Sequence, residues 1–370
     1  MKFEKINYGQ VNKRVLVAPL DWGLGHATRC IPIIYELLNL NLDVVIAAEG
    51  KNKILLKKEF PQLQFLHLPG YNISYTNNAF WLPIKLLWQT PKIFNRIFAE
   101  QRWLKKVIKE ENLSAVISDN RMGLHHNSIA CIYITHQLSI KTGNRFTEWV
   151  SQQIHYAFIN KFTACWVPDS AAATNLAGKL SHPKKLPHTP IKYLGPLSRF
   201  EKKNVAQKYD ILILLSGPEP QRTIFENLLV EQIKSYQGKV AMVKGLPQND
   251  GEDNFVMDGQ KNIAVANHLS TTALNNAILQ SGIVIARSGY TTVMDLIKLQ
   301  QRALLVATPG QTEQQYLADY LMKQHLFYAC SQSNFSLQDA LQKMKAFTFS
   351  NMVIDQYAYK EILQDFAASL

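Results

Sequence analysis

The feature of this chain that most restricts its fold is a repeated alternation of short apolar runs with segments of helical spacing. In the first half the apolar runs lie at 15–20, 44–48, 65–68, 115–118 and 130–135. The helical segments among them include 31–40 and 54–60. Apolar runs of this length indicate buried parallel strands, and the segments between them indicate the covering helices. The pattern predicts an α/β fold with a doubly wound sheet.

The alternation stops and then restarts, which predicts two domains. The break lies near 194–199, where a Gly-Pro turn leads into the polar stretch 200–204. Apolar runs and helical segments then follow at 211–215, 224–235, 240–243, 263–266, 272–280 and 283–286. We expect Rossmann-like domains at residues 1–200 and 201–370 that face a cleft. Because ligands of such sheets lie beyond the carboxyl ends of the strands, the cleft should be bordered by the turns at Gly23, Asp119, Ser216 and Ser288.

Composition excludes several classes of protein. The 370 residues are 47% apolar, which is enough for two buried cores. The first 14 residues are polar, with no charged-then-apolar leader, and no uncharged apolar run reaches spanning length. The spacing of the four cysteines is typical of neither a metal site nor a redox motif; they are Cys30, Cys131, Cys165 and Cys330. We expect a cytoplasmic protein with reduced cysteines in its core.

Positive charge is concentrated in the first half. Residues 1–200 hold 25 Lys and Arg against 12 Asp and Glu, whereas residues 201–370 hold 15 against 16, for a net charge of +12. A one-sided excess predicts an anionic partner such as lipid head groups, a phosphorylated acceptor or nucleic acid. Nucleic acid is not expected, because the chain has no recognition-helix, zinc or RNP-like motif that could read bases.

A glycine-rich turn joins the first predicted strand to the first helix. In it, Gly23 and Gly25 allow close backbone approach, and His26 lies at the helix N-terminus. The G-x-G-x-x-G dinucleotide fingerprint fails, because its third glycine is Thr28. This position suits general acid–base chemistry or an oxyanion, although a tight turn with a structural histidine is the alternative.

Other candidate bases lie where later strands end. Asp119 follows the run 115–118, and His136 follows the next strand. Either could remove a proton from a hydroxyl in the cleft, and we rank the candidates in the order His26, Asp119, His136. The neighbours His125 and His126 point in different directions in any regular element, so they are a weak metal signal.

The second half contains a turn suited to a nucleoside diphosphate. The apolar run ending at Ala286 is followed by Arg287, Ser288 and Gly289, and a segment of helical spacing begins at once. A helix start presents free N–H groups to an anion. Asp295 falls about two turns into that helix, where its carboxylate could bind a ribose diol. The turn thus predicts a nucleotide site.

Together with the Gln314-Gln315-Tyr316 segment, this turn resembles the C-terminal half of the GT-B glycosyltransferases of family 28. The resemblance implies that Asp295 binds the ribose of a UDP-sugar, although the family more often has Glu there. It also implies that Gln314 and Gln315 contact the sugar and the diphosphate. The glycine-rich first loop would lie against the donor diphosphate and the acceptor.

Two further segments are similar to family motifs but depart from them. The Gly-Pro segment ending at Arg199 resembles one whose Arg reaches the diphosphate, with one residue more here. A solvated linker Arg is an equal alternative. Ser216-Gly217 parallels a Gly-Gly-Ser turn, but Pro218 and Pro220 remove N–H donors from the loop.

The resemblance implies sugar transfer from a UDP-sugar, with UDP-GlcNAc as the first candidate, to an acceptor hydroxyl with inversion. No Asp-x-Asp pair occurs in the chain, so we expect no metal and no further cofactor. Helix N-termini, Arg199 and Arg287 would stabilise the leaving group instead, although a salt-bridged structural residue is the alternative for Arg287. The acceptor would be lipid-linked or a glycan. Two alternatives stay open: a nucleotide-sugar hydrolase or epimerase, and a non-catalytic binding subunit.

The segment 80–109 mixes large apolar residues, among them Trp81, Trp88 and Trp103, with seven Lys and Arg. Such a segment could lie on an anionic membrane surface. A helix that covers a parallel sheet also has an apolar face and a basic outer face, and we favour that interpretation. A lipid-linked acceptor would reverse the preference and place the protein at the inner face of the membrane.

Overall fold

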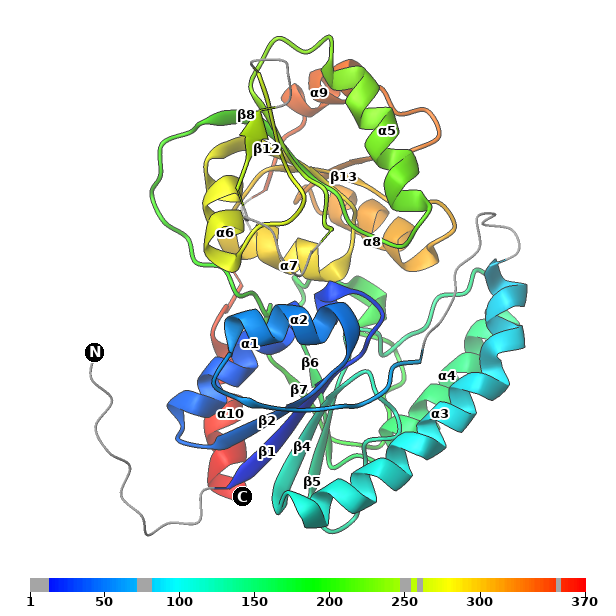
Figure 1. Ribbon diagram of the computed structural model, residues 1–370. Coiled ribbons are helices and arrows are strands. Elements are labelled where there is room, and N and C mark those ends of the chain that lie inside the picture. Colours follow the sequence, from blue (N-terminus) through cyan, green and yellow to red (C-terminus); the bar gives the residue numbers. More distant parts are fainter. Residues whose placement is uncertain (1–12, 72–81, 247–253, 258–261, 351–353) are drawn as a thin grey trace.

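The structure is a computed structural model with two stacked domains (Figure 1). It describes residues 13–71, 82–246, 254–257, 262–350 and 354–370, and for 82–90 only the backbone. The prediction of an α/β protein with two doubly wound domains is confirmed. Most of the predicted strands and helices lie within one or two residues of the expected positions.

The N-terminal sheet has the strand order β3-β2-β1-β4-β5-β6-β7, and all neighbours are parallel. Its strands are β1 (Arg14–Pro19), β2 (Asp43–Ala47), β3 (Gln64–Leu66), β4 (Leu113–Asp119), β5 (Ala130–Ile134), β6 (Ala164–Val167) and β7 (Ile191–Tyr193). The helices between them are α1 (Leu24–Asn39), α2 (Gly50–Glu59), α3 (Leu82–Glu110) and α4 (Arg145–Ile159). The order reverses between β1 and β4, so the first loop and Asp119 meet at the switch point.

The C-terminal sheet repeats this arrangement in the order β10-β11-β9-β8-β12-β13-β14, with only the short edge strand β10 antiparallel among the described strands. Its strands are β8 (Tyr209–Leu214), β9 (Val240–Val243), β10 (Val256–Met257), β11 (Ile263–Ala266), β12 (Ser281–Ala286), β13 (Ala303–Val306) and β14 (Tyr328–Cys330). The helices of this domain are α5 (Gln221–Ile233), α6 (Thr271–Leu279), α7 (Tyr290–Leu299), α8 (Thr312–Lys323) and α9 (Leu337–Lys345), and the chain ends in α10 (Ala358–Ser369). Here the switch point lies between β8 and β12.

Alternate residues of each central strand pack into different cores. Val15 and Val17 of β1 face α1, whereas Leu16 and Ala18 face the side of α3 and α4. The core on the α1 side continues into the C-terminal domain, where it includes Val293 of α7. Helices α1 and α7 are therefore in contact between the two sheets (Figure 1), and they bring the switch points of both domains together.

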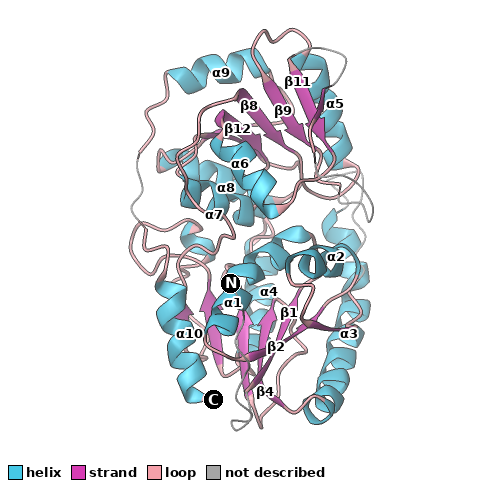
Figure 2. Ribbon diagram, turned by 60° about the vertical axis from the view of Figure 1, so that its left-hand side comes forward, coloured by secondary structure: helices cyan, strands magenta, loops and turns pink. Residues whose placement is uncertain are grey.

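The last helix departs from the expected division at residue 200. We expected 201–370 to form the second domain, but α10 packs against α1 and β7 of the first. Figure 2 shows it running beside the N-terminal sheet. The rings of Trp166 on β6 and Phe366 on α10 meet edge to face, with centroids 5.3 Å apart. Burial of Phe366 and Leu363 holds the chain end to the N-terminal domain.

Helix α3 covers the N-terminal sheet over its second half. Leu104 and Val107 are buried in the core under it, Trp103 packs against the same core, and Lys105 and Lys106 are exposed. This agrees with a sheet-covering helix. Trp81 lies outside the described residues, as does the side chain of Trp88. No described helix is both long and apolar enough to cross a membrane.

Candidate functional site

The carboxyl ends of the two sheets meet across short contacts between the domains. The Thr291 hydroxyl on α7 donates to the Gly25 carbonyl at 3.2 Å, and the Tyr290 hydroxyl donates to the Pro168 carbonyl at 2.8 Å. The Thr312 hydroxyl at the start of α8 donates to the Lys141 carbonyl at 2.7 Å. The predicted turns at Gly23 and Ser288, which directly precede two of these contacts in the sequence, therefore lie at the junction of the two domains.

Glycine is needed at two positions of the first loop, for a different structural reason at each. Gly23 has φ +110°, a conformation that side chains with a Cβ rarely adopt, and the next residue begins α1. Gly25 lies so close to α7 that a Cβ there would be 2.8 Å from the Thr291 hydroxyl. Glycine at 25 thus permits the contact between the domains, which brings His26, the next residue, close to α7.

His26, Asp119 and Arg29 form a hydrogen-bonded group at the N-terminal switch point. Asp119 is fully buried at the end of β4 and accepts two bonds from the Arg29 guanidinium, one of them 2.6 Å from Nε. His26 Nδ1 lies 3.2 Å from Asp119 Oδ1 and 2.8 Å from Arg29 Nη2. The His26 side chain is 16% exposed. Both partners contact Nδ1, which leaves Nε2 as the nitrogen for a substrate.

The charges in this group oppose one another. Burial alone would raise the pKa of the Asp119 carboxyl, but Arg29 and then His26 outweigh burial and lower that pKa to about 2. Burial and then the charge of Arg29 lower the pKa of His26, against the opposite effect of Asp119. Asp119 is therefore an ionised carboxylate behind His26 and is too weakly basic and too buried to take a proton from a substrate. His26 is the group that can.

A second histidine joins this group to the C-terminal domain. His136 lies just after β5, where Arg29 Nη1 is 3.3 Å from its Nδ1, and its Nε2 is 2.7 Å from Glu313 Oε1 on α8. Its ring stacks on Tyr290 of α7 with centroids 4.2 Å apart and planes 5° apart. Because both ring nitrogens of His136 have partners, it is less suited than His26 to act as a base. Its place is a bridge between the domains.

The predicted ribose ligand, Asp295, lies on α7 next to the interdomain linker. Its Oδ1 accepts a 2.5 Å bond from the Ser198 hydroxyl. Burial raises the pKa of its carboxyl to about 7, against the lowering effects of Ser198 and Arg199. Arg199 itself donates to the Thr271 hydroxyl at 3.1 Å. The structure thus brings Arg199 and Asp295 to the same place from two separate sequence motifs.

Arg287, in the turn before α7, forms its hydrogen bonds within its own domain. Arg287, expected to meet the leaving group, is buried and donates to the carbonyls of Val306, Ala307 and Gln221. Its guanidinium also lies over the Phe225 ring, 4.1 Å from the centroid, and burial lowers its pKa to about 10. These hydrogen bonds tie the strand ends together, as the structural alternative for Arg287 expects, while Nε has no hydrogen-bond partner among the described residues and a role toward a leaving group stays a prediction.

Ser288 is likewise engaged inside its domain, because it is fully buried and its hydroxyl donates to the Gln314 carbonyl at 2.8 Å. Gly289 is the residue before α7, in extended conformation. The Gln314 side chain accepts from the Thr308 N–H at 3.0 Å. Two predicted ligands are exposed instead, namely Gln315 on α8 and Ser216 after β8. Of these residues, only the exposed ones have free side chains.

No group of three His, Cys, Asp or Glu side chains in the described residues has the geometry to hold a metal ion. His125 and His126 are separated: His125 is buried near Gln101, and the His126 ring contacts the Ser128 hydroxyl at 2.7 Å. All four cysteines are unpaired and three of them are buried.

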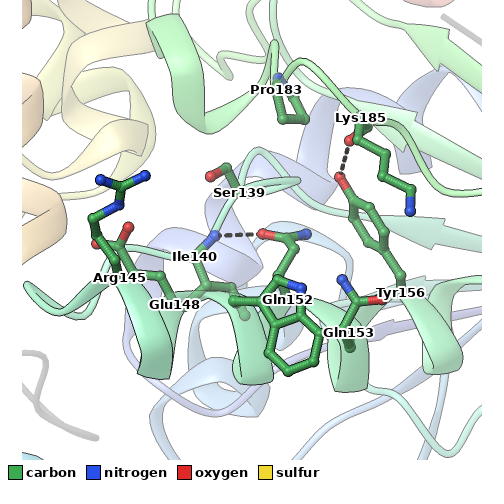
Figure 3. A pocket seen from close by; sticks show the side chains of 10 residues that line it. Ser139, Ile140, Arg145, Glu148, Gln152, Gln153, Tyr156, Pro183 and Lys185 are labelled. Carbon is green, nitrogen blue, oxygen red and sulfur yellow. Dashed lines mark hydrogen bonds between the residues drawn. The ribbon is translucent and has the colours of Figure 1, made fainter.

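A separate groove of about 330 Å³ lies on the outer side of the N-terminal domain, between α4 and two loops (Figure 3). Gln152 of α4 accepts from the Ile140 N–H at 3.0 Å, and the Tyr156 hydroxyl donates to the Lys185 carbonyl at 2.5 Å. The first bond holds the loop that follows His136, and the second holds the loop that precedes β7. The polar side chains of the groove are thus partly used to support the site.

Sequence reasoning missed Arg29, Glu313 and Tyr290. Arg29 could have been found, because it lies one helical turn after His26 and therefore on the same face of α1. Glu313 precedes the predicted Gln314, but its role depends on a histidine 177 residues away, which only the fold brings to it.

Comparison with known proteins agrees with this geometry. Residues 228–361 match the sequence model of the glycosyltransferase family 28 C-terminal domain. The C-terminal domain is therefore of the family 28 type, and the protein is a glycosyltransferase. The match covers most of the C-terminal domain, including Asp295 and Gln314. No curated protein matches the chain by sequence.

Solved glycosyltransferases share the GT-B fold over nearly the whole chain. The glycotransferase of kitacinnamycin is 12% identical, with 97% of this chain and 95% of that chain covered and a TM-score of 0.61. For MurG of Acinetobacter baumannii the values are 13%, 96%, 94% and 0.53. For UGT71G1 of Medicago truncatula, solved with UDP-glucose, they are 13%, 97%, 98% and 0.56. Identities this low establish the fold of this glycosyltransferase and leave its substrates open.

Proposed function

We propose that this glycosyltransferase moves a sugar from a UDP-sugar, with UDP-GlcNAc as the first candidate, to an acceptor hydroxyl with inversion and without a metal. The observation that carries the proposal is the position of His26. It lies at the switch point of the N-terminal sheet, next to a glycine that touches the first turn of α7. The same helix carries Asp295. The proposed base, His26, and the proposed nucleotide-binding residue, Asp295, thus lie on the two helices that meet between the domains. This arrangement suits a displacement at the anomeric carbon of the donor.

In the proposed reaction, His26 Nε2 takes the proton of the acceptor hydroxyl. The acceptor oxygen forms a bond to the anomeric carbon while the bond from that carbon to the diphosphate oxygen breaks, and the electron pair leaves with UDP. Attack opposite the leaving group inverts the anomeric centre. Asp119 acts through His26 by stabilising the imidazolium that forms, as a buried carboxylate does for a catalytic histidine.

The donor side of the proposal rests on the C-terminal domain. Asp295 would accept hydrogen bonds from the ribose diol, and the exposed Gln315 and Ser216 would contact the sugar and diphosphate. Arg199, beside Asp295, would supply positive charge. In the glycosyltransferase neighbour solved with UDP-glucose the fold is the same, which supports a UDP-sugar as the first donor to test.

The acceptor side rests on the N-terminal domain and its excess of basic residues. We propose a lipid-linked acceptor or a glycan. The exposed Phe98 and basic residues of α3 are where a peripheral contact with an anionic membrane would form. Flotation with vesicles of anionic phospholipid, at low and high salt, tests that contact. Flotation that high salt abolishes supports the contact. A protein that floats with neutral vesicles but not with anionic vesicles contradicts it.

We expect Asp295→Asn to lower UDP-sugar affinity by about tenfold to a hundredfold, because bonds to a charged acceptor contribute about 1.5–3 kcal/mol. Calorimetry without divalent metal, with UDP-GlcNAc, UDP-glucose, a GDP-sugar and a dTDP-sugar, measures this. Asp319→Asn on the exposed surface of α8 is the matched control and should bind like wild type. Absence of UDP-sugar binding by wild type would contradict the donor assignment.

The same carboxyl predicts a pH dependence of donor binding. Because the pKa of Asp295 is about 7 in the free protein, the group is partly protonated at neutral pH. Ribose hydroxyls donate to the ionised form, so binding should release protons near pH 7, and affinity should rise with pH and then level off. UDP-GlcNAc is the ligand to use, since its diphosphate has no proton to lose in that range. Calorimetry in two buffers of different ionisation enthalpy measures the release, which Asp295→Asn should abolish. Equal heats in both buffers for wild type would contradict the assignment.

A further inference from the structure

We propose that Arg29 is a positioning residue for sugar transfer, which holds His26 and Asp119 in register and cancels the negative charge that Asp119 would otherwise impose on the imidazole. The inference rests on the proposed function in that His26 is taken as the base. It adds a residue that acts on the base through fixed contacts and does not touch substrate.

Arg29 contacts three ionisable side chains from inside the protein. Its side chain is only 2% exposed, and its guanidinium has three different partners: the Asp119 carboxylate, His26 Nδ1 and His136 Nδ1. The guanidinium donates to the Asp119 carboxylate and can donate to His136 Nδ1. A base at His26 Nε2 requires that the Nδ1–H of His26 donates to Asp119, so Arg29 acts on His26 Nδ1 through its adjacent positive charge and through packing. A buried arginine needed only to balance Asp119 would not require contacts with both histidines.

The charge of Arg29 opposes the electrostatic effect of Asp119 on His26. A histidine whose only charged neighbour is a buried carboxylate gains basicity and tends to be protonated, and a protonated imidazole cannot take a proton from an acceptor. Here the guanidinium lies closer to His26 Nδ1 than the carboxylate does, at 2.8 Å against 3.2 Å. The pair therefore presents a nearly neutral environment to His26, so that burial, followed by the charge of Arg29, lowers the pKa of the ring against the opposite effect of Asp119.

The other groups around His26 do not replace this effect. From α1 it faces Arg29, from β4 Asp119, and from the loop after β5 His136, which weakly disfavours the charged ring. From the other domain, α7 contributes the neutral Tyr290 and Thr291. The carboxylate of Glu313 on α8 is paired with His136. Arg29 is thus the positive group that offsets Asp119 directly.

The test is a titration of His26 by NMR in the full-length protein with isotope-labelled histidine, with the His26 signal assigned from a His26→Asn variant. In Arg29→Met we expect the His26 pKa to rise by about one to two units, because Asp119 is then unopposed. Arg29→Lys keeps a positive charge near Asp119, but a single ammonium group cannot contact both Asp119 and His26. We therefore expect a smaller rise of the His26 pKa in this variant. A folded Arg29→Met protein in which His26 titrates as in wild type would overturn the proposal.

Arg29→Met leaves Asp119 buried without a partner and could fail to fold. In that case Arg29→Lys decides, since it retains the ion pair: an unchanged His26 titration would count against the proposal, and a shift toward higher pH would support it. The double variant Arg29→Met with Asp119→Asn removes both charges, and its His26 pKa should return near that of wild type. This readout needs no acceptor and no turnover, so it stands apart from any failure of the proposed transfer activity.

Discussion

We expect His26→Asn to lower the turnover of this glycosyltransferase by about a hundredfold to ten thousandfold, because a positioned general base contributes a factor of this size. Asparagine is close to histidine in shape and keeps a polar group at Nδ1 but cannot take a proton. The effect should fall on kcat, since His26 lies in the N-terminal domain and Asp295, the proposed nucleotide ligand, in the other. The measurement is UDP release from UDP-GlcNAc, first with water and then with glycan and lipid-linked acceptors.

The control for this variant is His188→Asn, a substitution of an exposed histidine away from the group, which should leave turnover unchanged. Calorimetry should show that His26→Asn still binds UDP-GlcNAc. Wild-type turnover in the variant would contradict the role of His26 as base. UDP release that no acceptor accelerates would favour the hydrolase alternative, and donor binding without any turnover would favour the non-catalytic binder.

We expect Asp119→Asn to destabilise the protein by about 3–5 kcal/mol, because it leaves the buried Arg29 charge without its partner. Chemical denaturation measures the change. Asp43→Asn is the matched control: Asp43 bonds Arg14 at 2.6 Å, but that pair is partly exposed, so its loss should cost about 1 kcal/mol or less. Equal losses in the two variants would show that burial of the Asp119 pair adds nothing.

The same carboxylate should make stability depend on acidity. Its folded pKa, about 2, lies below its ordinary value of 3.8, so the ionised form is favoured in the folded state. The stabilisation is present above pH 4 and is lost as pH falls toward 2, by about 2 kcal/mol in all. The difference in unfolding free energy between wild type and Asp119→Asn should therefore shrink by about 2 kcal/mol as the pH falls from 4 to 2. A constant difference would contradict this pKa.

The sequence alone was sufficient for the fold and for the residues carried by local patterns. Buried strands of parallel sheets have an apolar signature, and helix starts after glycine turns are visible in a few adjacent residues. For that reason Gly23, Gly25, His26 and Asp119 could be placed at strand ends before any coordinates. The family resemblance, carried by residues near Asp295 and Gln314, depends on the same short-range spacing.

The tertiary structure decided which of these residues work together. Arg287 fits an anion-binding turn by sequence, yet strand ends close around it and its N–H groups meet buried carbonyls. Helix α10 belongs to the first domain because Phe366 finds an apolar surface on β6. Nothing in local spacing predicts such long-range contacts.

The contacts of His26 with Asp119 and of His136 with Glu313 join residues that are 93 and 177 positions apart. Sequence determined that this protein has two Rossmann-like domains, a histidine at a helix start and a carboxylate two turns into another helix. Only the tertiary structure determined the protonation and the partners of those groups, because burial and charge act through space and not along the chain.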